Sequence, residues 1–200
     1  AMFDLRAIGV GGEPGVWESL RVGLDVVTYS GDKLLGAAQA GLISGKKELV
    51  ARIRSNPMFR ALRVDKLTYA VLEATLLAYA RQNHDSIPAL RMMRLTADDI
   101  GRRAEALAES LRLHAPKLWV AMVQGASVIG GGAAPGAVLP TVLLAITCEG
   151  LSADELAARL RASRPAIIAR VEEGRVLLDL RTVFPEQDSV VAEALAHAGS

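Results

Sequence analysis

The sequence predicts an α/β fold for this chain of 200 residues. Short apolar runs that are rich in β-branched residues and bounded by glycine indicate buried strands, and amphipathic segments of helical period lie between them. Hydrophobic residues make up 51% of the chain, so a sizeable core can be buried. Lysine and arginine number 23 against 22 aspartates and glutamates, a balance that argues against a surface binding nucleic acid over its whole extent.

The first part of the chain is expected to form two strands followed by helices. Strands are predicted over residues 24–29 and 40–45, and a short helix over residues 45–54 that Pro57 ends. Asp65 is the expected N-cap of a longer helix. Its three- and four-residue spacing predicts a buried stripe made of Leu67, Ala70, Val71, Ala74, Leu77 and Ala78. A polar segment then marks a hinge, so the chain is expected to divide near residue 86.

The second part predicts a smaller α/β sandwich. Thr96 and Asp99 form a weak capping box at the start of one helix, and Ser152 and Glu155 form a clean one at the start of another. Strands are expected over residues 117–123, 140–147, 166–171 and 176–180, and a closing helix over residues 188–197. Elements in this order suggest a sheet covered by helices on one face.

A short polar turn between the first two predicted strands carries one lysine, Lys33. A lysine held at a strand end between buried elements loses part of its hydration, which favours the neutral amine. A neutral amine condenses with aldehydes, and the aldehyde that most often uses such a lysine is pyridoxal 5′-phosphate (PLP). The spacing alone leaves a solvated surface lysine open. Ser30-x-x-Lys33 also matches the serine-nucleophile signature of penicillin-binding enzymes, but the Ser-Asp-Asn and Lys-Thr-Gly that complete this signature do not occur in the sequence.

The segment Tyr29-Ser30-Gly31-Asp32-Lys33-Leu34-Leu35-Gly36, followed by Gln39-Ala40-Gly41, carries a resemblance to a known family. It is similar to the cofactor-lysine segment of bacterial L-seryl-tRNA(Sec) selenium transferases, which reads Phe-Ser-Gly-Asp-Lys-Leu-Leu-Gly-Gly-Pro-Gln-Ala-Gly. Residues 12–14, 56–66 and 177–183 also resemble that family and follow its order. The family's Gly-Pro is replaced by Ala37-Ala38, and the family's chains are longer, so this sequence corresponds to their C-terminal part.

The resemblance implies the C-terminal part of a fold-type-I PLP-dependent transferase. Residues 1–86 would be the end of the large cofactor-binding domain, and residues 87–200 the small C-terminal α/β domain. The implied activity is conversion of seryl-tRNA(Sec) to selenocysteinyl-tRNA(Sec) with selenophosphate, in a cytoplasmic homo-oligomer of which this chain is a truncated portion. Two alternatives stay open: a related PLP enzyme that acts on a small amino acid or amino-sugar acid, and a non-catalytic isolated domain.

The resemblance also implies roles for single residues. Lys33 would bind PLP and act as acid and base, and Asp32 would help to handle the substrate's proton, although Gly31-Asp32 is also a common turn pair. Ser30 would bond to the cofactor phosphate or serve as a turn hydroxyl. Arg60 and Arg63 share a face if their turn is helical.

Two guanidinium groups next to helix N-terminal amides make an anion site. The resemblance implies that this site holds the phosphate of the selenium donor, and the alternative is a solvated basic face.

Other candidate sites are not supported by the sequence. Cys148 is the one cysteine, which excludes an internal disulfide and a cysteine metal cluster, and its apolar surroundings indicate core packing. The three histidines lack metal-ligand spacing, so no metal is expected. The glycine-rich segment 130–136 is expected to be a connector. The longest uncharged run, residues 118–148, is broken by glycine and proline, so no membrane span is expected.

Overall fold

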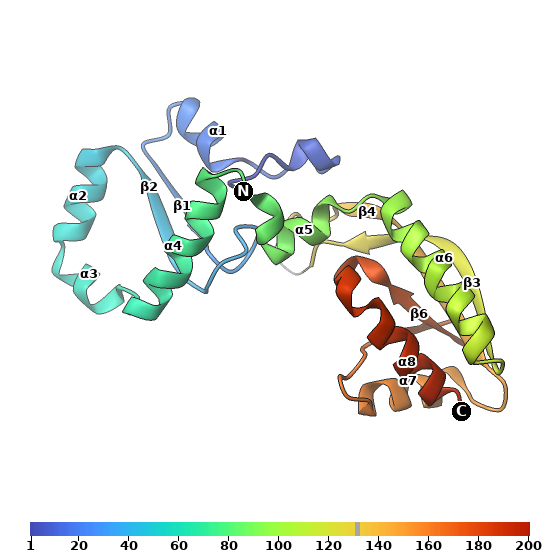
Figure 1. Cartoon of the computed structure of the whole chain (residues 1–200). Helices are drawn as coiled ribbons and strands as arrows, with labels where there is room; N and C mark the ends of the chain where they lie inside the picture. Colours follow the sequence, from blue (N-terminus) through green and yellow to red (C-terminus); the bar gives the residue numbers. More distant parts are fainter. Residues whose placement is uncertain (131–132) are drawn as a thin grey trace. The chain divides into compact units, whose positions relative to one another are not determined.

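The structure is a computed structural model that describes residues 1–130 and 133–200 (Figure 1). Part of the connector expected over residues 130–136 lies outside the described residues. The chain forms two compact units, Ala1–Arg94 with Val128–Ala137, and Leu95–Ser127 with Val138–Ser200. The expected division near residue 86 falls one helix earlier than this boundary, because the helix that follows residue 86 belongs to the first unit.

The first unit contains a two-stranded antiparallel sheet and several helices. Its elements are η1 (Leu5–Ile8), α1 (Val16–Arg21), β1 (Val26–Ser30), β2 (Gly41–Gly45), α2 (Lys47–Ser55), α3 (Pro57–Leu62), α4 (Lys66–Ala80), η2 (His84–Ser86) and α5 (Pro88–Arg94). The two predicted strands are confirmed, and their register pairs Val26 with Gly45 and Ser30 with Gly41. Pro57 stands at the first position of α3, where its missing N–H costs nothing.

Helix α4 begins as predicted but buries a different face. The Asp65 side chain accepts hydrogen bonds from the N–H groups of Leu67 and Thr68, which confirms the N-cap. The predicted buried stripe is wrong, since its members Leu67, Val71 and Leu77 are exposed. The buried face instead carries Leu72, Leu76 and Tyr79, which pack with Leu35, Ala40, Tyr29 and Leu42. This small cluster, the hairpin core, supports the turn that carries Lys33.

The second unit contains the sheet and the helices predicted for an α/β sandwich, but the strand expected over residues 166–171 is confined to Arg170–Glu172. Its elements are α6 (Ala97–His114), β3 (Leu118–Val128), β4 (Val138–Cys148), α7 (Ala153–Ala162), β5 (Arg170–Glu172), β6 (Arg175–Asp179), η3 (Leu180–Thr182), η4 (Pro185–Gln187) and α8 (Asp188–Ala198). The four-stranded sheet has the order β3-β4-β6-β5, and β6 pairs antiparallel with both β4 and β5. Both predicted capping boxes, at Thr96 and at Ser152, are confirmed.

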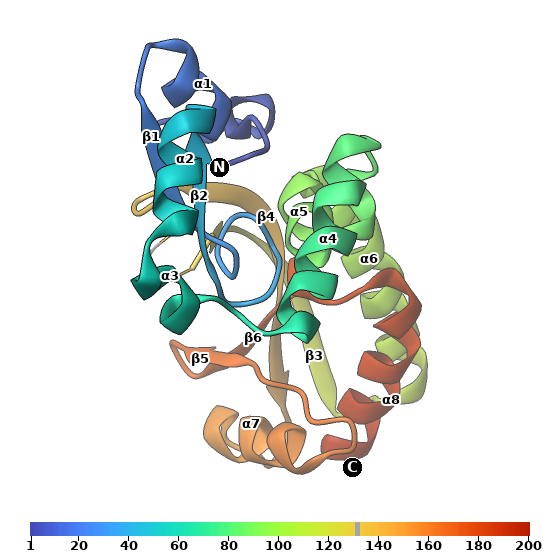
Figure 2. The same cartoon turned by 90° about the vertical axis from the view of Figure 1, so that its left-hand side faces the viewer.

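The helices of this unit cover one face of the sheet, as expected. Alternate residues of β4 (Val142, Leu144 and Ile146) join one core cluster with side chains of α6, α7 and α8. The intervening Leu143 and Ala145 pack on the other face, which follows from the two-residue period of a strand. Figure 2 shows α6 and α8 alongside each other over this sheet. The single cysteine, Cys148, lies in the same core, as its apolar surroundings indicated.

The family-like segment 177–183 ends β6 in a buried polar network. Asp179 accepts hydrogen bonds from the hydroxyls of Ser127 (2.6 Å) and Thr141 (2.9 Å). Arg181 is 4% exposed and donates to the carbonyl oxygens of Leu95 and Pro140, each at 2.6 Å. Burial lowers the pKa of Arg181. Through these hydrogen bonds the segment connects the start of α6 with β3, β4 and β6. Asp179 and Arg181 therefore stabilise the fold of this unit.

Candidate functional site

The structure brings Ser30, Asp32 and Lys33 together at one turn. The Lys33 Nζ atom lies 2.9 Å from Asp32 Oδ2 and donates a hydrogen bond to it. The Ser30 hydroxyl donates to the other carboxylate oxygen of Asp32. The hydrogen bond from Ser30, followed by that from Lys33, lowers the pKa of Asp32. These residues form a chain of hydroxyl, carboxylate and ammonium, and Asp32 is ionised at neutral pH.

The backbone explains why these polar side chains share one side of the turn. Leu34 and Leu35 are buried, and Leu35 belongs to the hairpin core, so the preceding Asp32 and Lys33 are left toward solvent. The turn is closed by hydrogen bonds from the N–H of Gly31 to Ala40 O, of Gly36 to Lys33 O, and of Ala37 to Gly31 O. The buried leucines hold the turn against the core, and the amine of Lys33 therefore lies on the solvent-exposed side of the turn.

Two glycines allow the turn to close this tightly. A Cβ atom on Gly31 would lie 2.4 Å from the carbonyl oxygen of Ala38, so only glycine fits there without a shift of the backbone. Gly36 has a φ of +73°, in the left-handed region that favours glycine. The residues flanking Lys33 are therefore dictated by backbone geometry.

The amine of Lys33 is more accessible than the sequence predicted. Its side chain is 48% exposed and is paired with Asp32, whose side chain is 27% exposed. The expected desolvation of this amine is not provided by the residues that the structure describes. Sequence reasoning assumed that buried strands on both sides would enclose the lysine, whereas no residue of β1 or β2 is fully buried.

Arg60 and Arg63 occupy different settings. Arg60 lies within α3, whereas Arg63 follows its end with extended backbone (φ −65°, ψ 142°), so the two do not continue one helical face. Neither side chain forms an ion pair with any residue in the ranges 1–130 and 133–200. The first N–H groups of α4 already bond to Asp65 and cannot also bind an anion. The expected anion site thus keeps two unpaired guanidinium groups but loses the helix amides.

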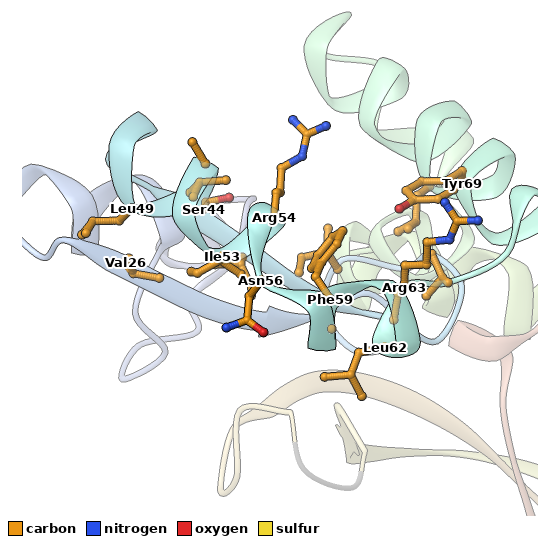
Figure 3. Close-up of a pocket in the computed structure, with 18 of the residues that line it drawn as sticks. Val26, Ser44, Leu49, Ile53, Arg54, Asn56, Phe59, Leu62, Arg63 and Tyr69 are labelled. Atoms are coloured by element: carbon orange, nitrogen blue, oxygen red, sulfur yellow. The ribbon is translucent and has the colours of Figure 1, made fainter.

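A cavity of about 1840 Å³ lies between β2, α2, α3 and α4, and Arg63 lines it while Arg60 does not. Figure 3 shows its apolar wall, with Phe59 and Leu62 on α3, and Arg54 and Arg63 among the polar residues. Arg54 and Arg52, which also line it, make no ion pair within the described part of the chain. The cavity therefore combines an apolar lining with three unpaired arginines.

The described part of the chain shows neither a metal site nor a membrane-spanning helix. Within the described ranges, no group of three or more histidine, cysteine, aspartate or glutamate side chains is placed to hold a metal ion. None of the helices described is both long and apolar enough to cross a bilayer.

Comparison with known proteins decides the family. A family model described as L-seryl-tRNA selenium transferase matches residues 1–184. The L-seryl-tRNA(Sec) selenium transferase of Geobacter sulfurreducens is 43% identical over 202 residues, which cover 100% of this chain and 44% of that protein. The chain belongs to the L-seryl-tRNA selenium transferase family. The enzyme of the same name from Aquifex aeolicus is 39% identical over 195 residues, which cover 97% of this chain and 43% of that protein.

This member of the selenium transferase family spans less than half the length of the curated relatives that it matches. Among solved structures, a methionine γ-lyase from Micromonospora echinospora is similar with a TM-score of 0.34 and 16% identity, over 92% of this chain and 52% of that one. The α/β class rests on the helices and sheets of the chain itself.

The turn fits one part of PLP. Its donor set is one primary amine, one carboxylate and one hydroxyl, and the amine is open to solvent. A primary amine is what the aldehyde of PLP requires. Lys33 would hold the aldehyde end, with Asp32 and Ser30 beside it.

Sequence reasoning missed one residue at this turn. The hydroxyl of Tyr79, on α4, reaches the carbonyl oxygens of Leu34 and Leu35. The separation of 45 residues between Tyr79 and Leu34 leaves no local sequence signal for this contact.

Proposed function

We propose that the full-length protein carrying this chain converts seryl-tRNA(Sec) to selenocysteinyl-tRNA(Sec), with PLP on Lys33 and selenophosphate as selenium donor. The observation that carries the proposal is the Lys33 turn in a chain that is 43% identical, over its whole length, to a protein named for this reaction. In the overall reaction the seryl hydroxyl is replaced by a selenol, and the phosphoryl group of the donor leaves as inorganic phosphate.

PLP, when bound, supplies an electron sink that makes the α-proton of the seryl group acidic. Lys33 is the base for that proton, since its side chain is 48% exposed and provides the one amine among Ser30, Asp32 and Lys33. Asp32 orients the amine through the 2.9 Å hydrogen bond. Ser30 fixes the carboxylate by donating to its other oxygen.

Arg60 and Arg63 bind the phosphate of the selenium donor in this proposal. Their guanidinium groups have no carboxylate partner among the residues described, so an anion would not have to displace one. Arginine also suits phosphate because its planar group donates two parallel hydrogen bonds.

The test uses the full-length protein loaded with PLP. Borohydride reduction followed by peptide mapping should place the phosphopyridoxyl group on Lys33. The Lys33→Ala protein should keep its fold and lose turnover by about 100-fold or more, because it loses both the attachment point and the base. A label on another lysine, or retained turnover in Lys33→Ala, would refute the role of Lys33.

A second candidate follows from Ala37 and Ala38, which replace the Gly-Pro of the resembling family pattern in the loop next to Lys33. It is a PLP enzyme that acts on a small amino acid or amino-sugar acid. Competition between seryl-tRNA(Sec) and free amino acids for the same protein separates the two candidates. Preference for a free amino acid would overturn the selenium-transfer proposal and leave the lysine chemistry in place.

A further inference from the structure

The last turn of α4 is tied to the backbone that directly follows Lys33. The Tyr79 hydroxyl lies 3.3 Å from the carbonyl oxygen of Leu34 and 3.2 Å from that of Leu35, and it donates to this pair of acceptors. The ring packs in the hairpin core and forms a T-shaped pair with the His84 ring, with centroids 5.8 Å apart. Burial raises the pKa of Tyr79 to about 12, so its hydroxyl keeps its proton at neutral pH and remains a donor.

These two carbonyl groups have no other hydrogen-bond donor in the described part of the chain. Leu34 and Leu35 are 8% and 3% exposed, so water has little access to this stretch. Buried carbonyl groups that lose their donor are costly, and the backbone then rearranges to find another. One phenol oxygen therefore restrains the two peptide units next to Lys33.

We propose that Tyr79 is a positioning residue whose hydroxyl, by holding the backbone at Leu34 and Leu35, fixes where the Lys33 amine stands. The inference rests on the proposed function, because it assigns the amine a task that requires a fixed place. Lys33 has a long, flexible side chain that is half exposed, so the side chain itself is not held by packing. The hydrogen bond to Asp32 orients the amine, and the backbone of Lys33 sets the point from which the side chain extends.

A packing role alone would not need the hydroxyl. Phenylalanine has the same ring and would fill the same volume against Leu35 and Leu72. Tyr79→Phe therefore removes only the tie to the two carbonyl groups.

Tyr29 provides a matched control within the same cluster. It lies on β1, packs in the hairpin core, and its hydroxyl is 3.0 Å from the hydroxyl of Ser44 on β2. Tyr29→Phe makes the identical chemical change in the same core and leaves the carbonyl groups of Leu34 and Leu35 bonded.

The experiment compares full-length wild type, Tyr79→Phe and Tyr29→Phe in two measurements. The first is hydrogen exchange, without PLP, at the N–H groups of Gly36 and Ala37, which close the turn. Exchange there should become about tenfold faster in Tyr79→Phe and stay near the wild-type rate in Tyr29→Phe. The second is steady-state kinetics, in which kcat should fall about tenfold in Tyr79→Phe with little change in the KM for seryl-tRNA(Sec).

The inference is overturned if Tyr79→Phe behaves like Tyr29→Phe in both measurements, or if exchange quickens while kcat stays unchanged. Failure of the wild type to transfer selenium would refute the proposed function instead, and the exchange measurement on the turn would still report on the tie. If Tyr79→Phe does not fold, 3-fluorotyrosine at position 79 keeps the ring and changes only the strength of the donor. Unaltered exchange and kcat in that protein would equally overturn the inference.

Discussion

Replacing Gly31 by alanine tests whether the tight backbone of the turn sets the place of Lys33. The new Cβ atom would lie 2.4 Å from Ala38 O, a distance that real Cβ atoms essentially never show. It would also lie 3.3 Å from methyl groups of Leu42 and Leu72, which leaves little room to move away. Because the nearest atom is backbone, relief requires residues 31–38 to shift, and Lys33 lies within them.

The expected cost follows from overpacking. A methyl group forced into a filled site destabilises a protein by about 1–3 kcal/mol. For a unit of roughly 100 residues, each kcal/mol lowers the melting temperature by about 4–8 °C. A displacement of about 1 Å at a catalytic group can cost about 100-fold in rate, so Gly31→Ala should lose about 10- to 100-fold in kcat.

Substitutions at two other glycines of the same hairpin separate a loss of stability from a displacement of Lys33. Gly41 has nothing within 4 Å of its added Cβ atom, so Gly41→Ala should be near wild type in melting and in rate. Gly45 lies at the far end of the hairpin, where its Cβ atom would be 2.3 Å from Asp25 O. Gly45→Ala should therefore be destabilised without a fall in kcat per folded molecule.

Thermal unfolding by circular dichroism and turnover of the PLP-loaded full-length protein supply the comparison. If Gly31→Ala keeps the melting temperature and kcat of Gly41→Ala, the turn is not as tightly packed as the geometry requires. If Gly45→Ala loses as much kcat as Gly31→Ala, the loss reflects general instability and not the place of Lys33.

Three further predictions concern the anion site, acid stability and the isolated chain. Arg60→Ala combined with Arg63→Ala should raise the selenophosphate KM by about tenfold or more and leave PLP uptake unchanged, since charge-assisted bonds to phosphate are lost; an equal loss of both would contradict the anion site. Hydrogen bonds from Thr96 lower the pKa of Asp99, so the associated stability is present above the unfolded pKa and is lost as pH falls through the lower folded value. Urea midpoints at about pH 7 and about pH 3 should therefore differ less in Asp99→Asn than in wild type, with Asp98→Asn as the control. The 200-residue chain alone should bind PLP weakly in an absorbance titration, because its turn fits only the aldehyde end, and stoichiometric uptake would contradict this.

The sequence could predict those structural features that depend only on residues close together in the chain. The capping boxes at Thr96 and Ser152 each need a partner only three residues away, so the sequence contains the whole interaction. The β5–β6 hairpin follows equally from its turn, in which Glu173 and Gly174 both have positive φ. The cluster of Ser30, Asp32 and Lys33 could be predicted for the same reason, because its members lie close together in the sequence.

The buried face of α4 could not be predicted from its period. This helix is apolar on more than one side, with Leu67, Val71 and Leu77 on one stripe and Leu72 and Leu76 on another. A three- and four-residue spacing fits both stripes, and the choice between them depends on contact with a hairpin more than 20 positions away. Tyr79 was missed for the same reason.

The exposure of Lys33 shows the limit of reasoning from residue type to chemistry. The position of an amine follows from local pattern, because strands and glycines around it specify a turn. Its hydration depends on every segment that packs over it, and in this chain the side chain is 48% exposed beside Asp32. The place of the amine could therefore be predicted from the sequence, and its exposure could not.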